Sequence, residues 1–120
     1  MKRSKKTILI VDDEEAVLRT IERILVFNGY NAFKAENGKK AIRMYKKHIS
    51  EIDLIILDYA LPDFDGLELY DEFKILNYNV KIIIASGLDV EELRLYDHTL
   101  EYLQKPFDVI TLLDAIKKLL

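Results

Sequence analysis

The sequence predicts an α/β domain in which one parallel sheet carries helices on both faces. Short apolar runs alternate along the chain with longer segments whose apolar residues recur at helical spacing. The runs Ile8–Val11, Leu54–Leu57 and Ile82–Ala85 are continuously apolar, as expected of strands buried on both faces. Two further runs, Asn31–Ala35 and Leu100–Leu103, include polar residues, which is typical of edge strands.

The apolar spacing and the residues that end each segment give the order of elements. Gly29 is predicted to end the first helix in the left-handed conformation, and Asn37 to cap the second helix. The predicted strands are Thr7–Val11, Asn31–Ala35, Ile52–Leu57, Lys81–Ala85 and Leu100–Leu103. The apolar faces of the five predicted helices lie within Val17–Leu25, Ala41–Ile49, Leu69–Leu76, Asp89–Asp97 and Val109–Leu120.

The strand order follows from placing the three apolar strands at the centre of the sheet. The order 2-1-3-4-5, a flavodoxin-like doubly wound five-stranded parallel sheet with five helices on two faces, satisfies this and keeps every crossover right-handed. It brings the carboxyl ends of the first and third strands together at the switch point. Ligands of open parallel sheets bind at that edge.

Length and composition are those of a single globular domain. The chain has 120 residues, a net charge of −3 and no cysteine. Disulfides and cysteine-based metal sites are therefore excluded, and no excess positive charge favours nucleic acid. No apolar run approaches the length of a membrane span. We expect residues 1–6 to be a disordered basic leader, residues 7–120 to form the domain, and the location to be cytoplasmic.

Polar side chains that could carry chemistry gather at the predicted switch point. Asp58 comes at or just past the end of the third strand, while Asp12 and Asp13 follow the first. Ser86 and Lys105 come at the ends of the fourth and fifth strands. Each has an ordinary alternative, because an aspartate can cap a helix or loop, a serine can form a turn and a lysine can be solvated. Their arrival at one sheet edge favours a shared site.

The chemistry of that group suits phosphoryl transfer. Three neighbouring carboxylates repel one another unless a cation neutralises them, and oxygen ligands in an open site favour Mg²⁺. A hydroxyl and an ammonium group can each hold a phosphoryl oxygen. A carboxylate in this setting can itself be the nucleophile, which would give an aspartyl phosphate.

The ordered set of motifs resembles the receiver domain of two-component response regulators. The resemblance spans the chain after the leader. It rests on Asp12-Asp13, Asp58, Pro62, Asp65-Gly66, Ser86-Gly87 and the run Tyr102–Pro106.

The resemblance implies a role for each residue of the acidic group. Asp58 is the implied phosphoacceptor. Asp12, Asp13 and Asp58 would bind Mg²⁺ together with the backbone carbonyl of Ala60.

The resemblance also implies how a phosphoryl group is held and read out. Lys105 and Ser86 would bind the phosphate, Tyr102 would act as the aromatic switch residue, and the Lys105-Pro106 bond would be cis. Phosphorylation would then alter the surface formed by the fourth helix, fifth strand and fifth helix.

The implied partners follow from this role. The donor is a sensor histidine kinase or a histidine phosphotransfer protein, and the recipient is a downstream output protein or domain. Phosphorylation-dependent homodimerisation is a further expectation. Direct nucleic-acid binding and membrane association by this segment are not expected. Such a domain is a phosphoacceptor with self-catalysed phosphorylation and dephosphorylation, and is not a conventional enzyme.

Two alternatives remain open at this point. A receiver-like module could bind proteins without being phosphorylated. An aspartate-nucleophile phosphatase of the haloacid dehalogenase type would also place an aspartate after a parallel strand. That enzyme class uses a second aspartate two residues later as acid and base, where this chain has Ala60.

Overall fold

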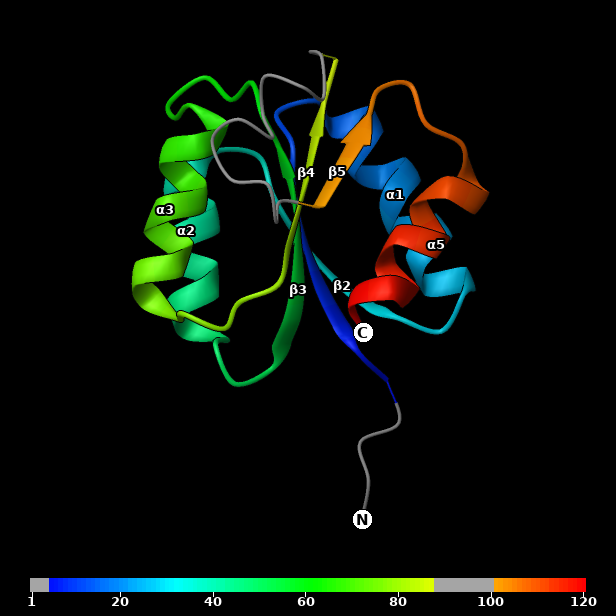
Figure 1. Cartoon of the computed structure of the whole chain (residues 1–120), viewed down its shortest axis with the longest axis horizontal. Helices are drawn as coiled ribbons and strands as arrows, with labels where there is room; N and C mark the ends of the chain where they lie inside the picture. Colours follow the sequence, from blue (N-terminus) through cyan, green and yellow to red (C-terminus); the bar gives the residue numbers. More distant parts are fainter. Residues whose placement is uncertain (1–4, 88–100) are drawn as a thin grey trace.

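In the computed structural model, which describes residues 5–87 and 101–120, five strands pair in parallel in the order β2-β1-β3-β4-β5 (Figure 1). This confirms the predicted doubly wound topology. The strands are β1 (Thr7–Val11), β2 (Asn31–Ala35), β3 (Ile52–Asp58), β4 (Ile82–Ser86) and β5 (Glu101–Gln104).

Four helices cover the two faces of the sheet within the described residues. They are α1 (Glu15–Phe27), α2 (Gly38–Lys47), α3 (Gly66–Leu76) and α5 (Val109–Leu119). Helices α1 and α5 lie on one side, and α2 and α3 on the other (Figure 1). The helix predicted at Asp89–Asp97 lies outside the described residues. No described helix has the length and apolar character needed to cross a membrane.

Alternate residues of the central strands face the two helical layers, which divides the core in two. The layer beneath α2 and α3 contains Leu9, Val11, Ile55, Leu57, Ile84, Tyr45 and Phe73. The layer beneath α1 and α5 contains Ile8, Ile10, Leu54, Ile56, Ile83, Leu25 and Leu112. Strands buried on both sides cannot alternate apolar and polar residues, which explains their continuously apolar runs.

Two predicted helix boundaries are confirmed. Gly29 has a φ of 90° directly after α1, a backbone conformation that favours glycine. The side chain of Asn37 caps α2 and accepts a hydrogen bond from the backbone N–H of Lys40 at 2.8 Å.

The ends of three strands differ by one residue from the predicted boundaries. β3 includes Asp58, β4 runs from Ile82 to Ser86, and β5 extends to Gln104. The predicted first residue of the fifth strand, Leu100, lies outside the described residues. The ladder pairs Asp58 with Ala85 and Ser86 with Gln104. Backbone pairing continues past the last apolar residue because it requires only N–H and C=O groups, so side-chain polarity marked the boundaries too early.

Candidate functional site

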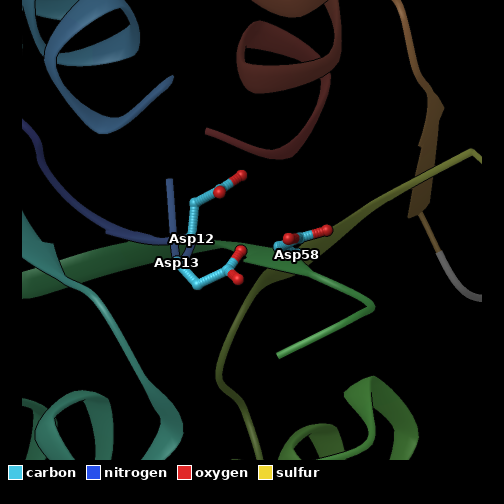
Figure 2. A group of neighbouring side chains, drawn as sticks. All are labelled: Asp12, Asp13 and Asp58. Atoms are coloured by element: carbon cyan, nitrogen blue, oxygen red, sulfur yellow. The ribbon is translucent and has the colours of Figure 1, made fainter. Parts of the chain in front are cut away.

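Two neighbouring strands bring three aspartates together. Val11 of β1 is in register with Leu57 of β3, so the next residues, Asp12 and Asp58, end up side by side. One carboxylate oxygen from each of Asp12, Asp13 and Asp58 lies within 4.8 Å of the others (Figure 2). Asp12 and Asp58 are 3% and 7% exposed, whereas Asp13 is exposed. The predicted acidic group is therefore assembled, with one carboxylate open to solvent.

Lys105 lies between the two buried carboxylates. Its Nζ is 3.0 Å from Oδ2 of Asp12 and 3.2 Å from Oδ1 of Asp58. The backbone N–H of Lys105 also donates to the carbonyl of Ser86 at 2.7 Å, which fixes the residue to the end of β4. The peptide bond from Lys105 to Pro106 is cis, as the resemblance implied.

The carboxylates and the ammonium group perturb one another's ionisation. Burial is the largest influence on the pKa of Asp58 and raises it, and the charge of Asp12 raises it further against the opposing effect of Lys105. Burial alone would lower the pKa of Lys105, but the hydrogen bond and charge of Asp12, together with Asp58, raise it overall. The raised pKa of Lys105 favours its protonated form, and the site holds three carboxyl groups for one ammonium group.

Backbone hydrogen bonds hold both ends of the loop that follows β3. The backbone N–H of Tyr59 donates to the carbonyl of Ala85 at 2.9 Å, and that of Gly66 donates to the carbonyl of Tyr59 at 2.8 Å. A Cβ on Gly66 would lie 2.7 Å from the Cα of Tyr59, so only glycine allows this approach. Ala60 is exposed within the loop, and its backbone hydrogen-bonds the Asp58 carboxylate.

The next helix begins where the loop ends. Asp65 caps α3 by accepting a hydrogen bond from Leu67 at 2.7 Å, and Glu68 completes a capping box. The position of the loop is thus set from α3 as well as from β3.

A contact that the sequence analysis missed attaches this loop to α2. The carboxylate of Asp63 accepts hydrogen bonds from the backbone N–H groups of Gly38 at 2.8 Å and Lys39 at 3.0 Å. Beside them, the ring of Phe64 occupies the space that a side chain at position 38 would need. The partners are 25 and 24 residues apart, and no local sequence signal links them.

These hydrogen bonds lower the pKa of the Asp63 carboxyl group. Burial, the largest influence on it, acts to raise its pKa, but the hydrogen bonds from Gly38 and Lys39 outweigh that influence and lower the pKa. Asp63 thus acts as an ionised cap on a helix from which it is distant in sequence.

The remaining predicted residues lie along the same edge of the sheet. Ser86 is the last residue of β4 and is 3% exposed. Tyr102 in β5 is half-buried and packs against the core layer beneath α2 and α3. Their predicted functions as phosphate ligand and switch residue stay predictions.

Comparison with known proteins shows which family the sequence resembles. The family model described as the response regulator receiver domain matches residues 8–117. The sporulation initiation phosphotransferase F of Bacillus subtilis is 33% identical over 116 residues, which cover 94% of this chain and 92% of that protein. The chemotaxis protein CheY of the same organism is 33% identical over 117 residues, covering 94% of this chain and 96% of CheY.

Solved structures give the same result for the fold. The response regulator TrrA of Thermotoga maritima, determined in complex with Mg²⁺ and BeF, superposes with a TM-score of 0.85 at 33% identity, over 96% of this chain and 99% of that one. CheY of Borrelia burgdorferi, in a CheX–CheY–BeF₃–Mg²⁺ complex, gives a TM-score of 0.87 at 27% identity, over 94% of this chain and 87% of that one. The chain belongs to the family of response regulator receiver domains, which are phosphoacceptors of two-component signalling.

Proposed function

We propose that Asp58 is the phosphoryl acceptor of this receiver domain and that Asp12, Asp13 and Asp58 hold Mg²⁺ during the transfer. One observation carries the proposal. The buried Asp58 carboxylate ends β3 beside those of Asp12 and Asp13 and in contact with the ammonium of Lys105. A residue that only capped the end of a strand would not require two further carboxyl groups beside it.

The donor set suits the metal. Three carboxylate oxygens within 4.8 Å of one another are hard ligands, and exposed Asp13 leaves room for coordinated water. The carbonyl of Ala60 is proposed as a further ligand because Ala60 lies two residues after Asp58, in the loop that follows β3. Mg²⁺ would supply positive charge that screens the attacking carboxylate and the phosphoryl oxygens.

The transfer itself is a single displacement at phosphorus. An oxygen of Asp58 forms a bond to phosphorus, and the bond from phosphorus to the imidazole nitrogen of a phosphohistidine donor breaks, leaving the electron pair on that nitrogen. Lys105 already contacts Asp58, so its ammonium group lies near the incoming phosphoryl oxygens and can stabilise their charge.

The readout is proposed to pass through the neighbouring strand ends. Ser86 would move its hydroxyl to a phosphoryl oxygen, and half-buried Tyr102 on the adjacent β5 would reorient into the space released. The surface around β5 and α5 would then differ between the two states and could support contact with an output protein or domain, or with a second copy of the chain.

The partners proposed are a cytoplasmic sensor histidine kinase or histidine phosphotransfer protein and a downstream output. The family includes proteins of nearly the same length as this chain and proteins that are much longer. The chain spans nearly all of CheY of Bacillus subtilis, but 44% of the cell cycle transcriptional regulator CtrA of Caulobacter vibrioides and 12% of the sensor kinase CckA of Brucella abortus. Self-catalysed phosphorylation from a small phosphoryl donor, and self-catalysed loss of the group, are part of the proposal.

A phosphatase reaction is not proposed. The residue two positions after Asp58 is Ala60, which has no proton to donate to a leaving group.

An NMR titration of the backbone amides tests metal and phosphoryl binding separately. Mg²⁺ should shift the amides of Asp12, Asp13 and Asp58 in a saturable way, and Asp13→Asn should weaken that response. Beryllofluoride added afterwards should shift Ser86 and Lys105 only in the presence of Mg²⁺, and not in Asp58→Asn. Absence of both responses would favour a module that binds proteins without phosphorylation.

A further inference from the structure

An open basic cleft lies between α1 and α2 beside the edge strand β2. Its volume is about 670 Å³, which is within the usual range for ligand-binding clefts. Five lysine or arginine side chains line it: Arg19 from α1, Lys34 from β2, and Lys40, Arg43 and Lys47 from α2. None of the residues assigned to phosphoryl transfer belongs to its lining.

The positive charge is concentrated on α2. This helix of ten residues has five basic side chains and no acidic one, in a chain whose net charge is −3. Lys40, Arg43 and Lys47 recur at intervals of three and four residues, so they share one face and repel one another. The helix dipole favours Lys47 in the last turn of α2, but it does not account for Lys40 and Arg43.

Neighbouring acidic groups only partly neutralise the cleft. Lys34 pairs with Glu22 at 2.9 Å, and Lys40 pairs with Glu36. Within residues 5–87 and 101–120, Arg19, Arg43 and Lys47 have no ion pair. Three cations from two helices therefore face the same cleft without an ion pair from the described chain, although Glu15 and Glu36 also line it.

The cleft also offers apolar surface. Half-buried Met44 of α2 supplies most of it among the basic side chains, since Leu18 of α1, which also lines the cleft, is only 5% exposed. Methionine adapts to partner side chains of different shape. No glycine lines the cleft, so it has no glycine-rich loop of the kind that holds phosphate through backbone N–H groups.

Charge complementarity and the apolar lining together identify the ligand class. We propose that this cleft binds an acidic segment of a partner protein that also carries leucine or similar apolar side chains. Seven residues of helix at a rise of 1.5 Å separate Lys40 from Lys47 by about 10 Å, so the segment needs about two helical turns. The site is separate from Asp58, and its binding does not require phosphorylation.

A protein segment fits better than a nucleic acid. Glu15 and Glu36 also line the cleft and would repel a regularly charged phosphate backbone. An acidic peptide can place apolar residues against Leu18 and Met44 and its carboxylates against the free cations. Nucleic acid binding is therefore an outcome that would overturn the proposal.

Fluorescence anisotropy with a labelled peptide of Glu-Glu-Leu repeats tests the inference on the intact chain. The wild type should bind the peptide more weakly as salt rises, because the attraction is partly exposed. The double variant Arg43→Gln/Lys47→Gln should bind it about tenfold more weakly. A peptide of Glu-Glu-Ser repeats should bind more weakly than the leucine peptide, because serine cannot replace the apolar contact with Met44.

A matched variant separates this site from general charge attraction. Lys117→Gln/Lys118→Gln removes the same charge from the last turn of α5 and should change affinity less than about twofold. Equal losses in both double variants, no binding by the wild type, or tighter binding of a single-stranded oligonucleotide of equal charge would each overturn the proposal. Unchanged circular dichroism and unchanged Mg²⁺ response show that the variants remain folded.

Discussion

Replacing Asp63 by alanine should destabilise the domain, although the side chain is exposed and lies outside the acidic group. The Asp63 carboxylate accepts hydrogen bonds from the backbone N–H groups of Gly38 and Lys39. Asn37 accepts one from Lys40. These three N–H groups at the start of α2 lack partners within the helix, so Asp63 satisfies two of them.

The expected loss follows from comparable helix caps. Removing a capping side chain costs about 1 kcal/mol, and the interaction of a carboxylate with the helix dipole adds a few tenths to about 1 kcal/mol at an exposed site. Solvent screening favours the lower part of that range. We therefore expect Asp63→Ala to lower the free energy of unfolding by about 1–2 kcal/mol, and Asp63→Asn, which keeps a neutral acceptor, to lower it less.

The loss should depend on pH in a defined direction. The hydrogen bonds lower the pKa of Asp63 in the folded protein below its ordinary value of 3.8. A carboxyl group of this kind contributes stability above its unfolded pKa and loses that contribution as the pH falls through its folded pKa. The difference between wild type and Asp63→Ala should therefore be full at neutral pH and shrink below about pH 4.

Urea unfolding of both proteins, at neutral pH and at about pH 3, measures the effect. Asp114→Ala is the control, since it removes an exposed carboxylate from inside α5 and should leave stability the same or slightly higher. Equal midpoints for wild type and Asp63→Ala at neutral pH, or a difference that persists unchanged in acid, would refute the role of Asp63 as an ionised cap.

Three further outcomes are expected. Gly66→Ala should destabilise the domain by about 2 kcal/mol or more, because its Cβ would lie 2.7 Å from the Cα of Tyr59; an unchanged thermal midpoint would contradict this contact. Lys105→Met should lower stability in a chelator by about 1–3 kcal/mol, since it leaves Asp12 and Asp58 without their ammonium partner, and added Mg²⁺ should reduce the loss in urea titrations. Burial and the charge of Asp12 raise the pKa of Asp58, so the stability of the wild type without divalent cations should fall as the pH rises from 3.8 through that raised pKa. Asp58→Asn should remove this fall. If Asp58→Asn were less stable than wild type at neutral pH, that would contradict the raised pKa of Asp58.

Much of this arrangement could be predicted from the sequence because it depends on local patterns. The apolar runs around Leu9, Ile55 and Ile83 reflect burial on both faces, and that burial fixes which strands are central. Once β1 and β3 are neighbours, the meeting of Asp12 with Asp58 follows from the register of the ladder. The position of Asp58 at the end of a strand could be predicted because the apolar run Leu54–Leu57 stops directly before it.

The attachment of the β3–α3 loop to α2 could not be predicted in this way. The bonds from Gly38 and Lys39 to Asp63 join segments that meet only after the strands and helices have packed. In sequence, Asp63 is an ordinary loop residue beside Pro62, and neither spacing nor polarity identifies its partner. The basic cleft was missed because it also depends on tertiary packing, which brings Arg19 close to a helix whose charges are visible in sequence.

Asp58 is proposed to accept a phosphoryl group with the help of a metal bound by its neighbours. Intact-protein mass spectrometry after incubation with acetyl phosphate tests it directly, with wild type, Asp58→Asn and the matched variant Asp63→Asn, each with Mg²⁺ and with a chelator. We predict a single phosphoryl adduct on wild type and Asp63→Asn that requires Mg²⁺, and no adduct on Asp58→Asn. An adduct that persists on Asp58→Asn would show that another residue is phosphorylated, and one that forms equally well in the chelator would show that the transfer does not need the metal.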